Sequence, residues 1–400
     1  MLLTMKEKHR IDVITAVMDG KIEVSEAGRV LERSTRQVYR VVKRVRERGV
    51  EGVIHGNRGK ESPRNTRKNI RDRILTLAEG KYQDTNDAHF KELLFKREDI
   101  DIGRETLRGI LRKAGIPPKR TRRRSKYRKR RERKEAFGMM LQIDASTHDW
   151  LEGRGPSLTL VAAIDDATGY AWGRFVTGET TWAYLNLMRE VMVSQGLPLS
   201  LYSDRHSIFH PLREPTIIEQ LQNSQPLTQF GRAMNELGIT VSKAWSPQAK
   251  GRIERFFGFS QDRLVVELRL AGAQSMGGAN KVLDTFLPDY NHHFTCTPKV
   301  QKSVFRKPPS SQYLDRILCL KETRTVNKDH TVSFEGLVLQ IPPSRKFSSI
   351  AKQRVEVLQL WDGRVEILYK QRTVACFSPE TITRLLLKGK ANRTQLQTVA

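Results

Sequence analysis

The chain has 400 residues, more than one compact core usually contains, so about two to four domains are expected. Lysine and arginine number 71 against 44 aspartates and glutamates, and the net charge of +27 points to a polyanionic partner such as nucleic acid. The scattered cysteines suggest neither a disulfide framework nor a zinc module, and no stretch is apolar enough to cross a membrane, so we expect a soluble cytoplasmic protein.

Residues 1–60 are expected to form a helix-turn-helix domain. Apolar residues recur at helical spacing over 11–18, and Ser25 is expected to cap a short second helix. Ser34 and Gln37 have capping-box spacing at the start of a third, basic helix, which is typical of a recognition helix in the major groove. A helical bundle with a solvated basic face is the alternative. The candidate DNA-contacting residues are Arg36, Gln37, Arg40, Lys43 and Arg44.

A second helical domain is expected over residues 61–118. Its last helix carries Arg104, Arg108 and Arg112 four residues apart on one face. Like charges at this spacing repel one another unless an anion neutralises them. We therefore expect a second DNA-contacting helix-turn-helix, with Arg104 and Arg108 against DNA.

Residues 119–135 are predicted to be a basic linker. Twelve of the sixteen residues from Lys119 to Lys134 are lysine or arginine. Such a run is usually solvated and flexible, but along a duplex it would gain phosphate contacts and release counterions. A nuclear localisation signal is the competing interpretation.

Residues 136–298 are predicted to form an α/β domain with a ribonuclease-H-like fold. In that fold the first and fourth strands are neighbours. Asp144 and Asp204, each at or near the end of its strand, would therefore converge. Glu254 is expected in the first turn of the following helix, leaning back over the strand ends. The expected strands are 139–144, 157–164, 170–176, 199–204 and 238–242.

Four motifs in this region resemble a known family. They are Gln-Ile-Asp-Ala-Ser-Thr-His-Asp-Trp at 142–150, Ile-Asp-Asp-Ala-Thr-Gly at 164–169, Tyr-Ser-Asp-Arg-His at 202–206 and Ser-Pro-Gln-Ala-Lys-Gly-Arg-Ile-Glu-Arg-Phe at 246–256. The wording is similar to insertion-sequence transposases of the ISNCY group, within the retroviral-integrase-like DDE superfamily. The resemblance covers nearly the whole chain and is most specific in the last motif.

The resemblance implies a magnesium-dependent DNA transposase whose catalytic and metal-binding residues are Asp144, Asp204 and Glu254. The spacing of the last two acids, 254 − 204 = 50, is longer than usual, and we attribute it to an inserted loop at 209–226. Two Mg²⁺ ions, which Mn²⁺ can replace, would bind the attacking and leaving oxygens of a phosphodiester displacement.

The expected partner is double-stranded DNA, as terminal inverted repeats and as target DNA, bound by a homo-oligomer. Water would first release a 3′-OH at the end of the element, and that hydroxyl would then attack target DNA.

Other polar residues of the core have simpler interpretations. Asp165 and Asp166 suit the turn between two strands, with a metal role as the alternative. The histidines are expected to be polar surface residues, with a DNA or supporting contact most plausible at His148. Three cations flank Glu254 at a helix start, where they oppose the helix dipole, so phosphate binding explains them better than stability. They are Lys250, Arg252 and Arg255.

The last third is expected to be a helix at 281–294, a linker at 300–312 and a small β-barrel at 320–380. Hairpin turns are indicated at Glu335-Gly336 and Asp362-Gly363. The barrel would be SH3-like and would either bind DNA or support the core.

Two other functions are compatible with the sequence. A sequence-specific DNA-binding protein could keep this fold without cutting DNA. A junction or repair nuclease could share the fold, but it would have little use for two helix-turn-helix domains, whereas recognition of terminal repeats requires them.

Overall fold

The computed structural model describes residues 3–59, 65–120, 131–211, 213–214, 217, 221, 226–243, 250–343 and 349–385. The chain divides into two compact units, Met1–Ile74 and Leu75–Ala400, each described here by itself. In the described parts, no helix has the length and apolar character needed to span a membrane. Most of the predicted basic linker, part of the 209–226 loop and residues 246–249 of the last motif lie outside the described residues.

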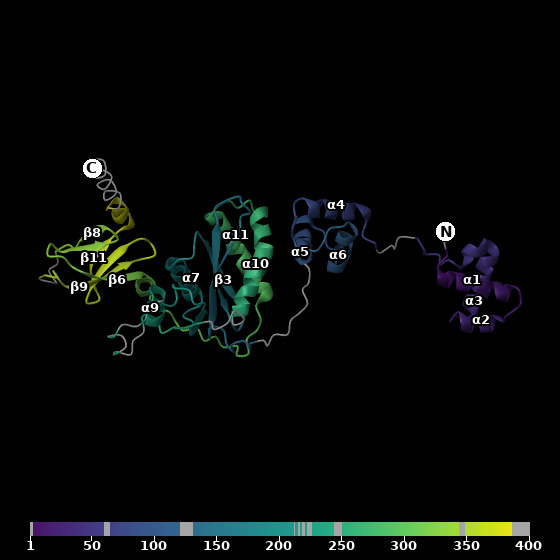
Figure 1. Cartoon of the computed structure of the whole chain (residues 1–400), viewed down its shortest axis with the longest axis horizontal. Helices are drawn as coiled ribbons and strands as arrows, with labels where there is room; N and C mark the ends of the chain where they lie inside the picture. Colours follow the sequence, from purple (N-terminus) through teal and green to yellow (C-terminus); the bar gives the residue numbers. More distant parts are fainter. Residues whose placement is uncertain are drawn as a thin grey trace. The chain divides into compact units, whose positions relative to one another are not determined.

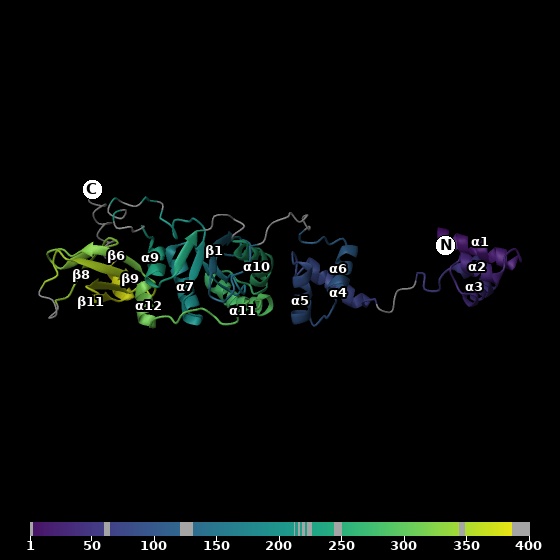
Figure 2. The same cartoon turned by 90° about the horizontal axis from the view of Figure 1, so that it is seen from below.

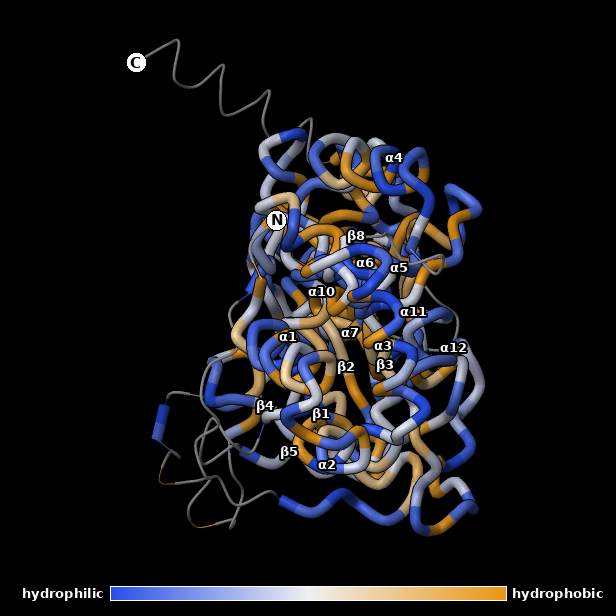
Figure 3. The backbone as a smooth tube through the Cα atoms, turned by 90° about the vertical axis from the view of Figure 1, so that its right-hand side faces the viewer, coloured by the Kyte–Doolittle hydropathy of each residue, from blue (hydrophilic) through white to orange (hydrophobic). Residues whose placement is uncertain are grey.

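The first unit begins with three helices, α1 (Met5–Met18), α2 (Val24–Val30) and α3 (Thr35–Arg48), followed by the short 3-10 helix η1 (Gly49–Val53). Their apolar faces share one core, and hydrophilic and hydrophobic residues alternate along α3 (Figure 3). The predicted capping box at the start of α3 is confirmed, because Ser34 and Gln37 bond to each other's backbone N–H. The predicted cap at Ser25 is wrong: α2 begins at Val24, and the Ser25 hydroxyl donates to Glu23 instead.

Three further helices follow, α4 (Lys68–Glu79), α5 (Asp87–Glu98) and α6 (Arg104–Lys113). Arg112, on the predicted arginine stripe of α6, donates to Asp87 of α5 and to a backbone carbonyl, so it holds two helices together. Helix α5 contacts the core through polar groups, including a two-bond pairing of Glu92 with Arg263 at 2.6 and 3.0 Å.

A five-stranded sheet forms the centre of the second unit. Its strands are β1 (Leu141–His148), β2 (Leu158–Asp165), β3 (Ala171–Val176), β4 (Ser200–Ser203) and β5 (Thr240–Lys243). The spatial order is β3-β2-β1-β4-β5, with the first three strands antiparallel and β4 and β5 parallel to β1. The predicted ribonuclease-H-like topology, with the first and fourth strands adjacent, is therefore confirmed.

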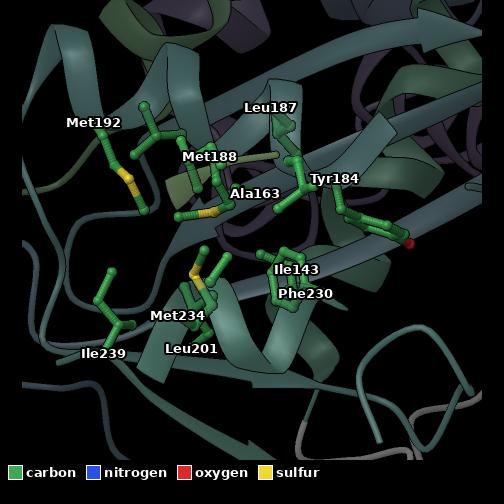
Figure 4. Packing of buried hydrophobic residues seen from close by; sticks show 14 of the residues in the cluster. Ile143, Ala163, Tyr184, Leu187, Met188, Met192, Leu201, Phe230, Met234 and Ile239 are labelled. Carbon is green, nitrogen blue, oxygen red and sulfur yellow. The ribbon is translucent and has the colours of Figure 1, made fainter. Parts of the chain in front are cut away.

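Helices cover both faces of this sheet. Helices α7 (Thr181–Ser194) and α9 (Gln229–Glu236) pack on one face, and α10 (Gly251–Leu270) and α11 (Met276–Phe294) pack on the other. Figure 1 shows the sheet between α7 on one side and α10 and α11 on the other, and Figure 2 shows β1 between α7 and α10. On the α7 face, side chains such as Ile143, Met188 and Phe230 meet in one apolar cluster (Figure 4).

The structure differs from the prediction at two element boundaries. Strand β1 continues to His148, so Asp144 lies in the middle of the strand and not at its end. The alternation of side chains in a strand explains why Asp144 is still available: Ile143 packs on the α7 face, and its neighbour points to the opposite face. The predicted linker at 300–312 also overlaps a short helix, α12 (Ser311–Ile317).

The carboxy-terminal part has six strands around one apolar core. Strands β6 (Leu320–Thr325), β9 (Arg354–Gln359), β10 (Val365–Tyr369) and β11 (Arg372–Phe377) form one antiparallel sheet, and β7 (Thr331–Phe334) and β8 (Leu337–Gln340) form a separate hairpin. Both predicted hairpin turns are confirmed. The predicted β-barrel is not closed among the described residues. The four-stranded sheet runs β11-β10-β9-β6, and the β7–β8 hairpin pairs with none of its strands.

The α7 side of the core should be sensitive to cavity formation. Leu187→Ala removes a side chain that is 1% exposed, and we expect a loss of about 2–5 kcal/mol in the free energy of unfolding. Val193→Ala, on the same helix at a residue that is 61% exposed, should change that free energy by no more than about 0.5 kcal/mol. Urea unfolding followed by tryptophan fluorescence measures both, and equal stabilities would contradict the packing described here.

Candidate active site

Two carboxylates from neighbouring strands meet beside the start of α10. Asp144 lies on β1, and Asp204 follows the last residue of the parallel strand β4. The ammonium nitrogen of Lys250, just before α10, lies 2.9 Å from the Asp144 carboxylate and 3.8 Å from that of Asp204. One cationic nitrogen thus lies between two acids that are 60 residues apart in the sequence (204 − 144).

The side chains of these two acids differ in how far they are buried. The Asp144 side chain is 21% exposed, and that of Asp204 is 42% exposed. Burial raises the pKa of Asp144, and the nearby Asp204 carboxylate adds to the rise, whereas the Lys250 ammonium opposes it. The Asp204 carboxylate also accepts a hydrogen bond from the backbone N–H of His206 at 3.0 Å, which holds the loop after β4.

Glu254 lies in the first turn of α10, as predicted, and is exposed. It is four residues after Lys250, a spacing that places two residues on the same face of a helix. Where the structure describes the chain, however, no three His, Cys, Asp or Glu side chains lie close enough together to hold a metal. Asp144 and Asp204 are therefore brought together, and Glu254 does not complete a three-acid cluster with them in this conformation.

Lys250 was expected to face phosphate, but it is 7% exposed and directed at the two acids. A buried ammonium is costly unless it is paired. The paired acids satisfy that requirement here, and the single ammonium of Lys250 offsets part of the charge of the two carboxylates.

A buried network near the start of β1 fixes the first turn of α10. Gln142 is fully buried: its amide nitrogen donates to Asp166 at 2.8 Å, and its amide oxygen accepts from the backbone N–H of Ile253 at 3.3 Å. Asp166, also fully buried, pairs with Arg252 at 2.7 Å and with Arg131. The network ties β1, the β2–β3 turn and the first turn of α10 together.

From the sequence, Asp165 and Asp166 were expected to serve the turn, with a metal role as the alternative. Asp165 does serve it, accepting from the backbone N–H and hydroxyl of Thr168 at 2.7 and 2.8 Å. The role of Asp166 as a buried partner of two arginines was missed, as was Gln142. The sequence did carry a signal for the buried role of Asp166. It is the second of two consecutive acids after an apolar strand, and the turn itself needs only one.

The histidines near the acids differ in their surroundings. His148 is exposed at the end of β1, with its ring 5.3 Å from that of Trp150. The expectation of surface histidines is wrong for His210, which is 9% exposed and bonds to the Ser203 hydroxyl at 3.2 Å. Burial lowers the pKa of His210, and nearby Lys243 adds to that effect, while Asp204 opposes it.

The predicted DNA-contacting residues of the helical parts are mostly exposed. Arg36, Arg40 and Lys43 are exposed on α3, and a cleft of about 770 Å³ within the first unit is lined by this helix and α1. Arg44 is half-buried, and its buried Nε has no hydrogen-bond partner among the described residues. The amide oxygen of Gln37 accepts from the Ser34 N–H, which leaves both donors of its NH₂ group for other contacts. On α6, Arg104 and Arg108 both lie beside the Glu105 carboxylate, at 3.3 and 3.7 Å.

Of the other two predicted cations, Arg255 is exposed, whereas the Arg252 side chain is only 10% exposed and paired with Asp166. Both belong to the first two turns of α10, so the predicted position of the basic residues on this helix holds, although only Arg255 is open to solvent.

Comparisons with solved structures are weak. The catalytic core of BIV integrase is 19% identical with a TM-score of 0.28, and the match covers 39% of this chain and 85% of that one. A simian T-cell lymphotropic virus intasome, solved in complex with PP2A regulatory subunit B56 gamma, is 13% identical with a TM-score of 0.35, over 76% of this chain and 99% of that one. The assignment of the fold therefore depends on the strand order given above.

Sequence comparisons are much stronger. A family model described as winged helix-turn helix matches residues 10–69. "Putative transposase y4bF" of Sinorhizobium fredii is 34% identical over 92% of this chain and 80% of its own length. The transposase for insertion sequence IS1202 of Streptococcus pneumoniae is 30% identical over 90% of this chain and 84% of its own length. With helix-turn-helix sequence at one end, paired acids on a ribonuclease-H-like sheet and this identity to transposases over most of its length, the chain belongs to the family of insertion-sequence transposases, enzymes that act on DNA.

Proposed function

We propose that this transposase binds the terminal inverted repeats of an insertion sequence, cleaves DNA there and joins the freed 3′-OH to target DNA. The observation that carries the proposal is the convergence of Asp144 and Asp204 on one cationic nitrogen. Two acids from adjacent parallel strands are costly to hold together unless a cation lies between them. A site that orders such a pair is suited to divalent cations.

The donor set fits magnesium. Carboxylate oxygens are the ligands that Mg²⁺ prefers, and the position of the Lys250 ammonium marks where a cation fits between the two acids. Asp144, Asp204 and Glu254 would hold two Mg²⁺ ions, for which Mn²⁺ can substitute. Bound there, the ions would activate the attacking oxygen and stabilise the leaving oxygen of the phosphodiester.

The residues of the chain have distinct roles in this proposal. Before DNA and metal bind, Lys250 offsets one of the two negative charges of the acid pair, and it then moves its charge to a DNA phosphate. Glu254, one turn further along the same face of α10, takes its place beside the acids. Because Arg252 pairs with Asp166 and the Ile253 N–H donates to Gln142, the start of α10 is held close to β1, and Glu254 needs to move only locally.

The remaining parts of the chain would bind DNA. We assign residues 1–60 and 61–118 to two helix-turn-helix domains, 119–135 to a basic linker that follows the DNA backbone, 136–298 to the catalytic core, and 320–380 to a small β-sheet domain that binds DNA. Several DNA-binding parts on one chain favour a homo-oligomer that holds two DNA ends. The second candidate function, DNA binding without cleavage on the same fold, is tested directly below.

The three acids should be required for cleavage and not for DNA binding. We expect Asp144→Asn, Asp204→Asn and Glu254→Gln each to abolish Mg²⁺-dependent cleavage, because each removes a carboxylate ligand while keeping its shape. Asp149→Asn, at an exposed acid just beyond β1, is the matched control and should remain active. Cleavage assays and gel shifts on terminal-repeat DNA give the two readouts.

An active variant would remove that residue from the proposed triad. If the wild-type chain bound the repeats and never cut them with Mg²⁺ or Mn²⁺, the protein would be the non-cleaving DNA-binding protein instead.

Helix α3 and the basic linker should affect DNA binding differently. Base contacts discriminate by about 1–3 kcal/mol each, whereas phosphate contacts are independent of sequence. Arg36→Ala, Arg40→Ala and Gln37→Glu should each reduce the preference for the terminal repeat over random DNA. Gln37→Glu also keeps a residue that can form the capping box, so helix stability, followed by circular dichroism, should not change.

Replacing arginines by glutamine within residues 120–130, which leaves Arg131 and Arg133 in place, should instead weaken binding to all DNA equally and reduce its salt dependence. Fluorescence anisotropy at several salt concentrations measures both series. Equal effects from the two sets would mean that α3 is a general basic surface and does not read sequence.

Asp166 should act as a positioning residue. Asp166→Asn removes the charge that pairs with Arg252 and Arg131, and we expect a loss of about 3 kcal/mol in the free energy of unfolding, as for other broken buried pairs. The cleavage rate at saturating DNA should also fall, whereas DNA affinity should stay close to that of the wild type. Asp101→Asn, at an exposed acid, is the control. Unchanged stability and cleavage would show that Asp166 does not position α10.

A further inference from the structure

A second cavity of about 230 Å³ lies on a different face of α10 from Lys250 and Glu254. Its α10 residues are Arg252, Arg255 and Phe259, which follow the i, i+3, i+7 spacing of one helix face. Gly169 of the β2–β3 turn and the last turns of α11 complete it. The cavity therefore borders the catalytic helix without including the paired acids.

The cavity carries more positive charge than the protein neutralises. Arg133, Arg252 and Arg255 line it, and no acid does. Within the described part of the chain, Arg252 pairs with Asp166, but Arg133 donates only to backbone carbonyls and Arg255 to the carbonyl of Gly251. The Asp166 carboxylate is shared between Arg252 and Arg131, and among the described residues no carboxylate pairs with Arg133 or Arg255.

Arg252 supplies a second, independent indication of a ligand. Its side chain is 10% exposed, and its buried Nε has no hydrogen-bond partner among the described residues. A buried charged donor without an acceptor is unfavourable, and a bound anion would supply that acceptor. Burial lowers the pKa of Arg252, and the neighbouring arginines add to this effect, whereas Asp166 opposes it.

Part of the cavity lining is aromatic. The rings of Phe259, Tyr290 and Phe294 lie with their centroids 4.7–5.2 Å from one another, and Phe294 is 46% exposed. Exposed aromatic rings beside a cationic groove are the combination with which proteins bind unpaired nucleotides, through phosphate contacts and base stacking. A base inside a duplex is already stacked on its neighbours and does not offer its face to such a wall.

We propose that this cavity binds one unpaired nucleotide of the DNA substrate, with its phosphate on Arg133, Arg252 and Arg255 and its base against Phe294 and Tyr290. The proposal rests on the proposed function only in taking DNA as the substrate. It adds a site for a single-stranded end or a locally opened base pair next to the catalytic helix.

The test compares two DNA probes without divalent metal: a blunt duplex of the terminal repeat and the same duplex with a short single-stranded overhang. The full-length chain should bind the overhang probe more tightly. Phe294→Ala should weaken that binding about tenfold, in the range measured for one stacked base, and leave the blunt duplex unaffected. Phe294→Trp, which keeps an aromatic face, should retain the preference, and Phe95→Ala, at an exposed ring on α5, should behave as wild type.

Arg255→Gln should reduce overhang binding and its salt dependence, because it removes a phosphate contact. Circular dichroism melting shows whether each variant is folded. Wild-type binding of both probes by Phe294→Ala would overturn the proposal, and so would equal weakening of both probes, which would indicate a duplex phosphate site. Cleavage of the blunt duplex with Mg²⁺ by the wild-type chain tests the proposed function separately, since it does not require this cavity.

Discussion

The contact between the first turn of α10 and strand β1 determines where the charged groups of the catalytic core lie. The amide of Gln142 accepts from the Ile253 N–H on one side and donates to Asp166 on the other. Asp166 in turn pairs with Arg252, so the helix start is bound to the strand by one fully buried network. Such a network is rigid only if all its groups are satisfied, which is why removal of a single member should disturb the whole helix start.

From that fixed point, α10 presents different chemistry on different faces. Lys250, just before the helix, is directed at the paired acids, and Glu254 follows it by four residues. Arg252 and Arg255 line a cationic cavity, and apolar residues pack on the sheet. A helix allows this because residues four apart share a face, whereas residues two apart lie nearly opposite each other. The proposed metal site and the proposed nucleotide site would therefore keep fixed positions relative to each other, because both lie along α10. This arrangement favours bringing a DNA strand to the acids in a defined position.

Much of the fold could be predicted because it depends on local patterns. The apolar strands, the capping box at Ser34 and the hairpin turn at Glu335-Gly336 are each encoded in a few consecutive residues, and the structure confirms them. The prediction for the end of β1 was wrong because it used the β1 sequence alone. Strand ends are decided by neighbouring elements: β2 pairs with β1 along its full length to His148, which the β1 sequence alone does not reveal.

The sequence by itself determined the family, the order of elements and the identity of the candidate acids, because motifs and periodicities are properties of the chain. Only the tertiary structure decided which groups meet. It directed Lys250 at two acids from different strands, buried Asp166 between arginines distant in sequence, and set aromatic rings of α10 and α11 beside a cluster of arginines. These contacts join residues far apart along the chain, and their energies depend on burial and distance, which exist only after the strands and helices have packed.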